Sequence, residues 1–142
     1  MCNKIIALLF VVFTSCSLKC DSKIHVDELI LEYAKENNFP YCKYVNNCLE
    51  GEPSSIKKMF CENLVFFDGE SAYMHAFNVY KITKFLGENR VVGIMKEFSK
   101  NELKIYFNNL QVGLEYESLK NKNVKETFPK IYSMIMSQTI GN

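Results

Sequence analysis

Few side chains in this sequence are of a type that could perform catalysis. His75 lies between Tyr73 and Phe77 and could act as a base, but no partner for it is identifiable nearby, so we assign it a structural or surface role. His25 is expected to be an exposed residue near the start of a helix. Asp68-Gly69-Glu70 lacks the further alternating ligands of a calcium loop, so it indicates a turn.

Known catalytic motifs are also missing. The sequence has no nucleophile elbow, no zinc-binding H-E-x-x-H pattern and no phosphate-binding glycine loop, and its 6 glycines are scattered. We therefore predict that the protein is not an enzyme and that it uses no cofactor and no metal.

The first 17 residues have the pattern of a secretory signal peptide. Lys4 supplies a charged start, Ile5 to Phe13 is apolar, and Ser15-Cys16-Ser17 provides small residues for cleavage. The apolar run is too short to span a bilayer, which takes about 20 residues. We predict a signal peptide at 1–17, a helical bundle domain at 18–142, and secretion. A rival interpretation is a bacterial lipoprotein with its lipid on Cys16.

Four cysteines remain after this cleavage: Cys20, Cys42, Cys48 and Cys61. An even number in a secreted chain predicts two disulfides, with three possible connectivities. The spacing does not offer the closely spaced pairs that a zinc site requires. Our preferred pairing joins Cys42 to Cys48 and Cys20 to Cys61, although the sequence alone does not determine it.

Composition is that of one globular domain. The chain has 142 residues, of which 48% are hydrophobic and 23% charged. Lysine and arginine total 17 against 16 acidic residues, so the net charge gives no reason to expect nucleic acid as a partner. We expect a monomer with no membrane span.

Apolar residues recur at helical spacing in four principal segments, at about 25–37, 71–86, 88–100 and 119–137. Ser54 or Ser55 is expected to cap an additional short helix. The stretch from Tyr41 to Ser55 has no period and predicts a loop held by cysteines. Leu103 to Phe107 alternates with period two and predicts an extended, strand-like crossing segment.

Pro129 interrupts the last apolar pattern. An interior proline costs a helix about 3 kcal/mol. Either Thr127 caps a shorter terminal helix with Pro129 in its first turn, or the long helix is kinked there.

These elements predict an all-α fold, a four-helix bundle with an extra short helix and a strand-like crossover. The long first and third connections suit an up-up-down-down topology. In this arrangement the helix at 25–37 runs parallel to the helix at 71–86, and the tight connection at Gly87-Glu88 reverses the chain.

The order of these features resembles the short-chain helical cytokines, with interleukin-7 nearest and interleukin-4 and interleukin-15 behind. The resemblance is carried by Cys20-Asp21 before the first helix, Phe60-Cys61-Glu62, Lys84-Phe85-Leu86, Gly93 to Phe98, and the terminal segment from Leu119 to Phe128. It implies a secreted ligand or antagonist that binds a cell-surface receptor ectodomain through its helix faces. The chain departs from the group in having no cysteine after Cys61 and no N-x-[ST] sequon, which would also suit a diverged viral or parasite mimic.

The resemblance places receptor contacts on the outward faces of the first and last helices. In the first, Val26, Leu29, Ile30 and Tyr33 are expected in the core, and in the last, Val124, Phe128, Ile131 and Ile135. The candidate receptor-binding residues are therefore Glu28, Leu31, Glu32, Lys35, Tyr132, Met134, Met136 and Gln138. Tyr132 or Met136 could instead widen the core stripe.

The alternative function is a secreted helical carrier of a small hydrophobic ligand, in the manner of insect odorant-binding proteins, whose six-cysteine spacing this chain does not reproduce. A carrier should contain an enclosed apolar cavity of roughly 300 Å³ or more. A cytokine-like ligand should have a filled core.

Overall fold

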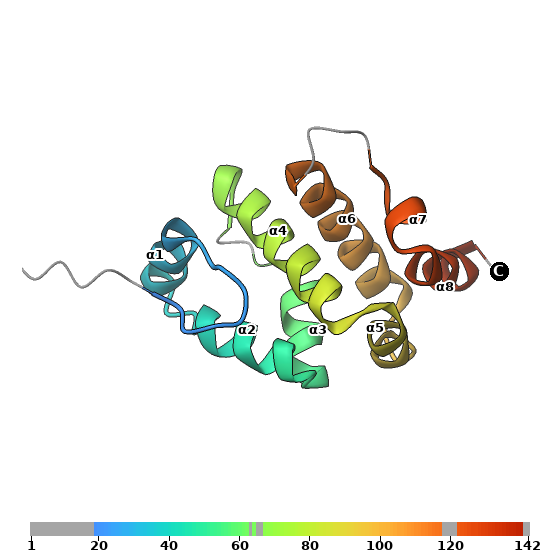
Figure 1. Cartoon of the computed structure of the whole chain (residues 1–142), viewed down its shortest axis with the longest axis horizontal. Helices are drawn as coiled ribbons and strands as arrows, with labels where there is room; N and C mark the ends of the chain where they lie inside the picture. Colours follow the sequence, from blue (N-terminus) through green and yellow to red (C-terminus); the bar gives the residue numbers. More distant parts are fainter. Residues whose placement is uncertain (1–18, 63, 65–66, 118–121, 141–142) are drawn as a thin grey trace, which may run out of the picture.

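The computed structural model describes residues 19–62, 64, 67–117 and 122–140, and all regular structure in these residues is helical (Figure 1). The all-α prediction is therefore confirmed. The predicted signal peptide at 1–17 lies outside the described residues. The helices are α1 (Glu28–Glu36), α2 (Tyr41–Glu50), α3 (Pro53–Cys61), α4 (Gly69–Leu86), α5 (Glu88–Met95), α6 (Lys100–Glu117), α7 (Val124–Thr127) and α8 (Pro129–Ile140).

The predicted loop between Tyr41 and Ser55 is wrong, because this segment contains α2 and the start of α3. The buried side chains of α2 recur at helical spacing; they are Tyr41, Val45, Cys48 and Leu49. Gly51 ends the helix in the left-handed region at φ 84°. Glycine, proline and two cysteines suggested a loop, but Gly51 is the C-terminal cap of α2 and Pro53 is the first residue of α3. Cys42 is the disulfide cysteine in the first turn of α2, and Cys48 is a buried free thiol.

Glu52, and not Ser54 or Ser55, caps α3. Its carboxylate accepts hydrogen bonds from the backbone N–H groups of Ser54 and Ser55 at 3.1 and 2.7 Å. Hydrogen bonds with the side chains of Ser54 and Ser55, together with these backbone bonds, lower the pKa of Glu52 to about 2. At the other boundaries, Asp68 caps α4 through a reciprocal bond pair with Ser71, and Gly87 ends α4 as predicted.

The centre of the molecule is the antiparallel pair α4 and α6, which lie side by side in Figure 1. Gly113 of α6 lies directly against the backbone of Ala76. Near the opposite end of the contact, Thr83 Oγ1 and the Tyr106 hydroxyl are 3.0 Å apart. This pairing corrects the strand-like prediction for Leu103 to Phe107, which is the interior of α6. The alternation covered too few residues to reveal the longer stripe of Leu103, Tyr106, Leu110 and Leu114, all 0% exposed.

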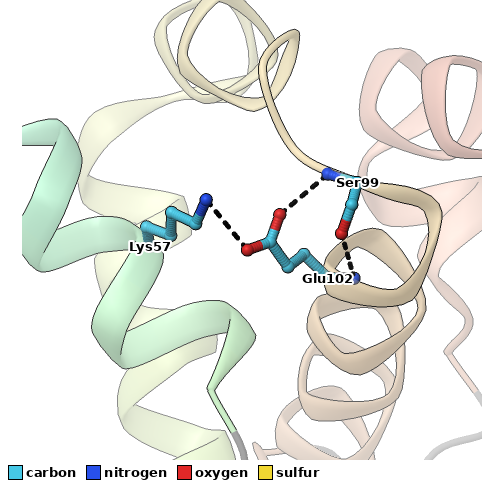
Figure 2. Close-up of polar contacts among 3 residues, drawn as sticks. All are labelled: Lys57, Ser99 and Glu102. Atoms are coloured by element: carbon cyan, nitrogen blue, oxygen red, sulfur yellow. Dashed lines mark hydrogen bonds and ion pairs between the residues drawn. The ribbon is translucent and has the colours of Figure 1, made fainter.

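Figure 2 shows how the start of α6 is fixed to α3. The Glu102 carboxylate accepts from the backbone N–H of Ser99 at 2.8 Å, and the Ser99 hydroxyl accepts from the backbone N–H of Glu102 at 3.3 Å. The second carboxylate oxygen of Glu102 pairs with Lys57 Nζ of α3 at 2.9 Å. One side chain thus caps α6 and joins it to α3.

The predicted helix at 119–137 is replaced by two helices, α7 and α8. Pro129 is the first residue of α8, where its missing N–H costs nothing, so the shorter terminal helix with proline in its first turn is correct. The predicted cap is wrong, because Thr127 is the last residue of α7 and Phe128 separates it from α8. Glu88 of α5 completes this start, because its carboxylate accepts from the backbone N–H groups of Lys130 and Ile131 at 2.7 and 3.2 Å.

The up-up-down-down topology is not confirmed. The segment before α1 lies against the second half of α4, where Lys81 Nζ donates to the carbonyl of His25. Tyr41, the first residue of α2 and five positions after the end of α1, contacts His75 in the first half of α4. The segment from His25 to Tyr41, which contains α1, therefore runs antiparallel to α4 and not parallel to it as predicted.

Two of the four cysteines that were predicted to form disulfides do so in the structure. Cys20 and Cys42 form a disulfide, whereas Cys48 and Cys61 are free and buried. The predicted bonds between Cys42 and Cys48 and between Cys20 and Cys61 are wrong. Cys42 and Cys48 are both on α2, where six residues correspond to about 600° of rotation, so their sulfurs point to different faces of one rigid helix.

We expect the two free thiols to resist alkylation in the folded protein. Both side chains are almost fully buried, and burial raises the pKa of Cys61 to about 12 and that of Cys48 further, so neither forms the reactive thiolate near neutral pH. Peptide mapping after iodoacetamide treatment without reductant should find Cys48 and Cys61 modified only when denaturant is present. Labelling in the native state, or a disulfide between them, would contradict the structure.

Candidate functional site

The candidate receptor contacts on α1 are partly where the sequence predicted them. Glu28, Glu32 and Lys35 are exposed. Leu31 was expected to point outward but is only 8% exposed. The buried stripe of this region is Val26, Ile30, Leu31 and Ala34, while the predicted core residues Leu29 and Tyr33 are half-buried. The stripe is rotated because α2, which was not predicted, packs beside α1.

On α7 and α8 the predicted core residues are confirmed. Val124, Phe128, Ile131 and Ile135 are all buried. The candidate contacts Tyr132, Met134, Met136 and Gln138 are half-buried, and the first three pack against the core. Their apolar surface is therefore explained in large part by packing within the chain.

The structure does not bring these two sets of residues together. α1 and α8 lie at opposite ends of the long axis of the molecule (Figure 1). The two sets of candidate residues therefore do not form one contiguous patch, and each end is considered separately.

At the α1 end, Leu31 and Lys35 line a groove of about 440 Å³ that is open to solvent. We call it the α1–α2 groove. Its apolar lining comes from α1, the turn that follows it and the first turn of α2. The lining residues are Lys19, Leu31, Ala34, Lys35, Asn38, Phe39, Pro40, Tyr41, Cys42 and Lys43.

The turn between α1 and α2 is held by short-range hydrogen bonds. The backbone N–H of Phe39 donates to the carbonyl of Ala34 at 2.8 Å, and Asn38 adopts φ 53°, a left-handed value that asparagine tolerates well. Pro40 then precedes α2 directly. The disulfide from Cys20 to Cys42 ties the segment before α1 to the first turn of α2 beside the groove.

Tyr41 connects the floor of the groove to a buried polar chain. Its hydroxyl is 3.0 Å from His75 Nδ1, and it accepts from Asn78 Nδ2 at 3.1 Å. His75 Nε2 is 2.9 Å from the carbonyl of Met59, which can only accept, so Nε2 carries the proton and Nδ1 accepts from Tyr41. Burial lowers the pKa of His75 to about 4, so the imidazole is neutral near pH 7. His75 is thus structural, as predicted.

Lysines surround the groove, and none of the described residues that line it is acidic. Lys19, Lys35 and Lys43 are exposed. Among the described residues, the ion pairs join Lys57 to Glu102, Lys58 to Glu62 and Lys84 to Glu117, so none of the three groove lysines is neutralised by such a pair. The groove therefore combines an apolar floor with a positive rim.

Other kinds of site receive little support from the geometry. Within residues 19–62, 64, 67–117 and 122–140, no three His, Cys, Asp or Glu side chains are grouped so that they could hold a metal ion. His75 is 5% exposed, and both of its ring nitrogens lie within hydrogen-bond distance of partners in the chain. None of the described helices is both long and apolar enough to cross a membrane.

No family model matches the chain, and neither a curated protein nor a solved structure matches it. The similarity to short-chain helical cytokines therefore remains a prediction from the sequence.

Proposed function

We propose that this protein is a secreted, cytokine-like ligand that binds the ectodomain of a cell-surface receptor, and that the α1–α2 groove is a contact site. The observation that carries the proposal is that Leu31 and Lys35, two candidate contacts of α1, lie in one open apolar groove. The disulfide between Cys20 and Cys42 fits an oxidising compartment such as the extracellular space.

The open shape of the pockets among the described residues favours this function over the alternative of a small-molecule carrier. The largest side chains of the interior are fully buried; among them are Tyr41, Phe60, Tyr106, Leu110 and Ile131. Four pockets lined by described residues, including the α1–α2 groove, are open to solvent. A carrier would enclose most of its ligand, whereas an open groove leaves one side for a macromolecular partner to cover.

Binding to a panel of immobilised receptor ectodomains tests this function. We expect the wild-type protein to bind at least one ectodomain saturably, and Leu31→Ala and Lys35→Ala to weaken that binding about tenfold or more, as for residues near the centre of an interface. Met134→Ala, at the opposite end of the molecule, is the matched variant that should retain wild-type affinity.

Circular dichroism of each variant separates a lost contact from a lost fold, and Lys35→Ala removes an exposed side chain whose loss does not threaten the core. Absence of binding to every ectodomain, together with saturable uptake of a fluorescent apolar probe such as 1-aminoanthracene, would overturn the proposal in favour of a carrier.

A further inference from the structure

The α1–α2 groove carries enough chemical detail to indicate what kind of partner segment it takes. Its floor is formed by carbon-rich side chains from three short segments, including Leu31, Phe39 and Tyr41. Its volume of about 440 Å³ is near the lower end of the range for ligand pockets, about 300–1,000 Å³. A space of this size suits one or two large apolar side chains that a partner inserts as anchors.

The three lysines at the rim of the groove also determine which charge a ligand should carry. Lys19, Lys35 and Lys43 approach the groove from three different segments, and its described lining contains no aspartate or glutamate. Because none of these lysines has an ion-pair partner within 4 Å among the described residues, a basic or neutral ligand would leave the positive potential uncompensated. Acidic side chains on both sides of the anchor would complement it.

A disulfide and buried hydrogen bonds hold the groove in a fixed shape. The disulfide between Cys20 and Cys42 fixes one wall, and the Tyr41 hydroxyl is held by both His75 and Asn78. A preformed site loses little conformational entropy when a ligand binds, so even a short segment can gain measurable affinity.

We propose that the α1–α2 groove binds a peptide segment of the partner in which a large apolar residue is flanked by aspartate or glutamate. This inference rests on the proposed function and specifies the chemistry of the segment that the receptor contributes. A polypeptide is favoured over an amphipathic small molecule such as a fatty acid, because the groove is open along one side and would leave a small ligand largely in water.

Selection of random 12-residue peptides displayed on phage tests the proposal without knowledge of the receptor. The immobilised full-length protein should enrich sequences with one Leu, Phe, Tyr or Trp next to two or more acidic residues. A synthetic consensus peptide should bind at least tenfold more weakly to the double variant Lys19→Glu/Lys43→Glu. Lys43 lies in the first turn of α2, where an acidic residue is favoured by the helix dipole, so this variant should remain folded.

The matched control is Lys96→Glu/Lys104→Glu, which changes the net charge equally at two exposed lysines outside the groove. It should leave the peptide affinity within twofold of wild type. A basic or purely apolar consensus, no enrichment, or equal loss in both double variants would overturn the proposal. Saturable binding of dodecanoate that is lost only in the groove variant, with no peptide selected, would overturn it in favour of a small-molecule site.

Failure of this inference can be distinguished from failure of the proposed function. If an ectodomain still binds Lys19→Glu/Lys43→Glu with wild-type affinity, the receptor function stands and the acidic segment is wrong. If no ectodomain binds the wild-type protein, the receptor function itself is wrong, whatever peptides are selected.

Discussion

Replacing Gly113 by alanine is expected to destabilise the protein by about 2 kcal/mol, although alanine is the better helix former by about 1 kcal/mol. A Cβ at this position would lie 2.3 Å from the carbonyl oxygen of Ala76 and 2.8 Å from Cβ of Tyr80. Both atoms belong to the rigid part of α4 and cannot rotate away. α4 and α6 would have to separate, and this overpacking costs more than the gain in helix propensity.

Gly93 offers a matched control, since it also lies within a helix, α5, but a Cβ there would meet nothing within 4 Å. Gly93→Ala should therefore stabilise the protein by about 0.5–1 kcal/mol. Urea unfolding followed by circular dichroism measures both changes. A stability gain in Gly113→Ala equal to that in Gly93→Ala would show that α4 and α6 do not approach as closely as the structure indicates.

The helices that the sequence predicts well are those whose apolar stripe is long and clearly bounded. The segment predicted at 71–86 is α4, extended by two residues, because Gly87 marks its end without ambiguity. The segment predicted at 25–37 contains α1, although its buried face was misjudged at Leu31. The start of α8 at Pro129 was one of two alternatives left open by the sequence, because proline at a first helical turn and proline at a kink look alike in the pattern.

α2 and α6 were not predicted, for two different physical reasons. α2 is short, and its stripe consists of Tyr41, Val45, Cys48 and Leu49, of which one is a cysteine that was counted as a disulfide partner. In α6, β-branched and aromatic residues at 105–107 mimic a strand locally, and the helix is stabilised by packing against α3 and α4. Tertiary contact decides the structure where local preference is ambiguous.

The candidate site depends on α2, one of the two helices that were not predicted. Lys35 could be recognised from α1 alone, but Lys43 and Tyr41 enter the groove only because α2 is a helix that begins directly after Pro40. The position of Lys19 could not be predicted, because it follows from the disulfide between Cys20 and Cys42.

Acid is expected to destabilise the folded protein by about 3 kcal/mol between pH 6.5 and pH 4 through His75 alone. The ordinary pKa of histidine is about 6.5, and burial lowers the pKa of His75 to about 4 in the folded protein. Well above pH 6.5 the imidazole is neutral in both states, so its contribution is constant. As the pH falls from 6.5 to 4, the unfolded chain takes up the proton first, and stability is lost until the folded protein is protonated as well.

The pH range in which stability is lost distinguishes the contribution of His75 from that of the carboxylates. Glu52, whose pKa is lowered to about 2 by its hydrogen bonds, loses its contribution only below about pH 4.5. In His75→Gln the amide can still donate to the carbonyl of Met59 and accept from Tyr41, so the variant should fold, with a stability that changes little between pH 6.5 and 4. His25→Gln replaces an exposed histidine and should keep the wild-type pH dependence. Urea unfolding at half-unit steps from pH 7.5 to 4 gives the three curves, and a wild-type slope in His75→Gln would mean that the buried imidazole is not the group whose protonation unfolds the protein.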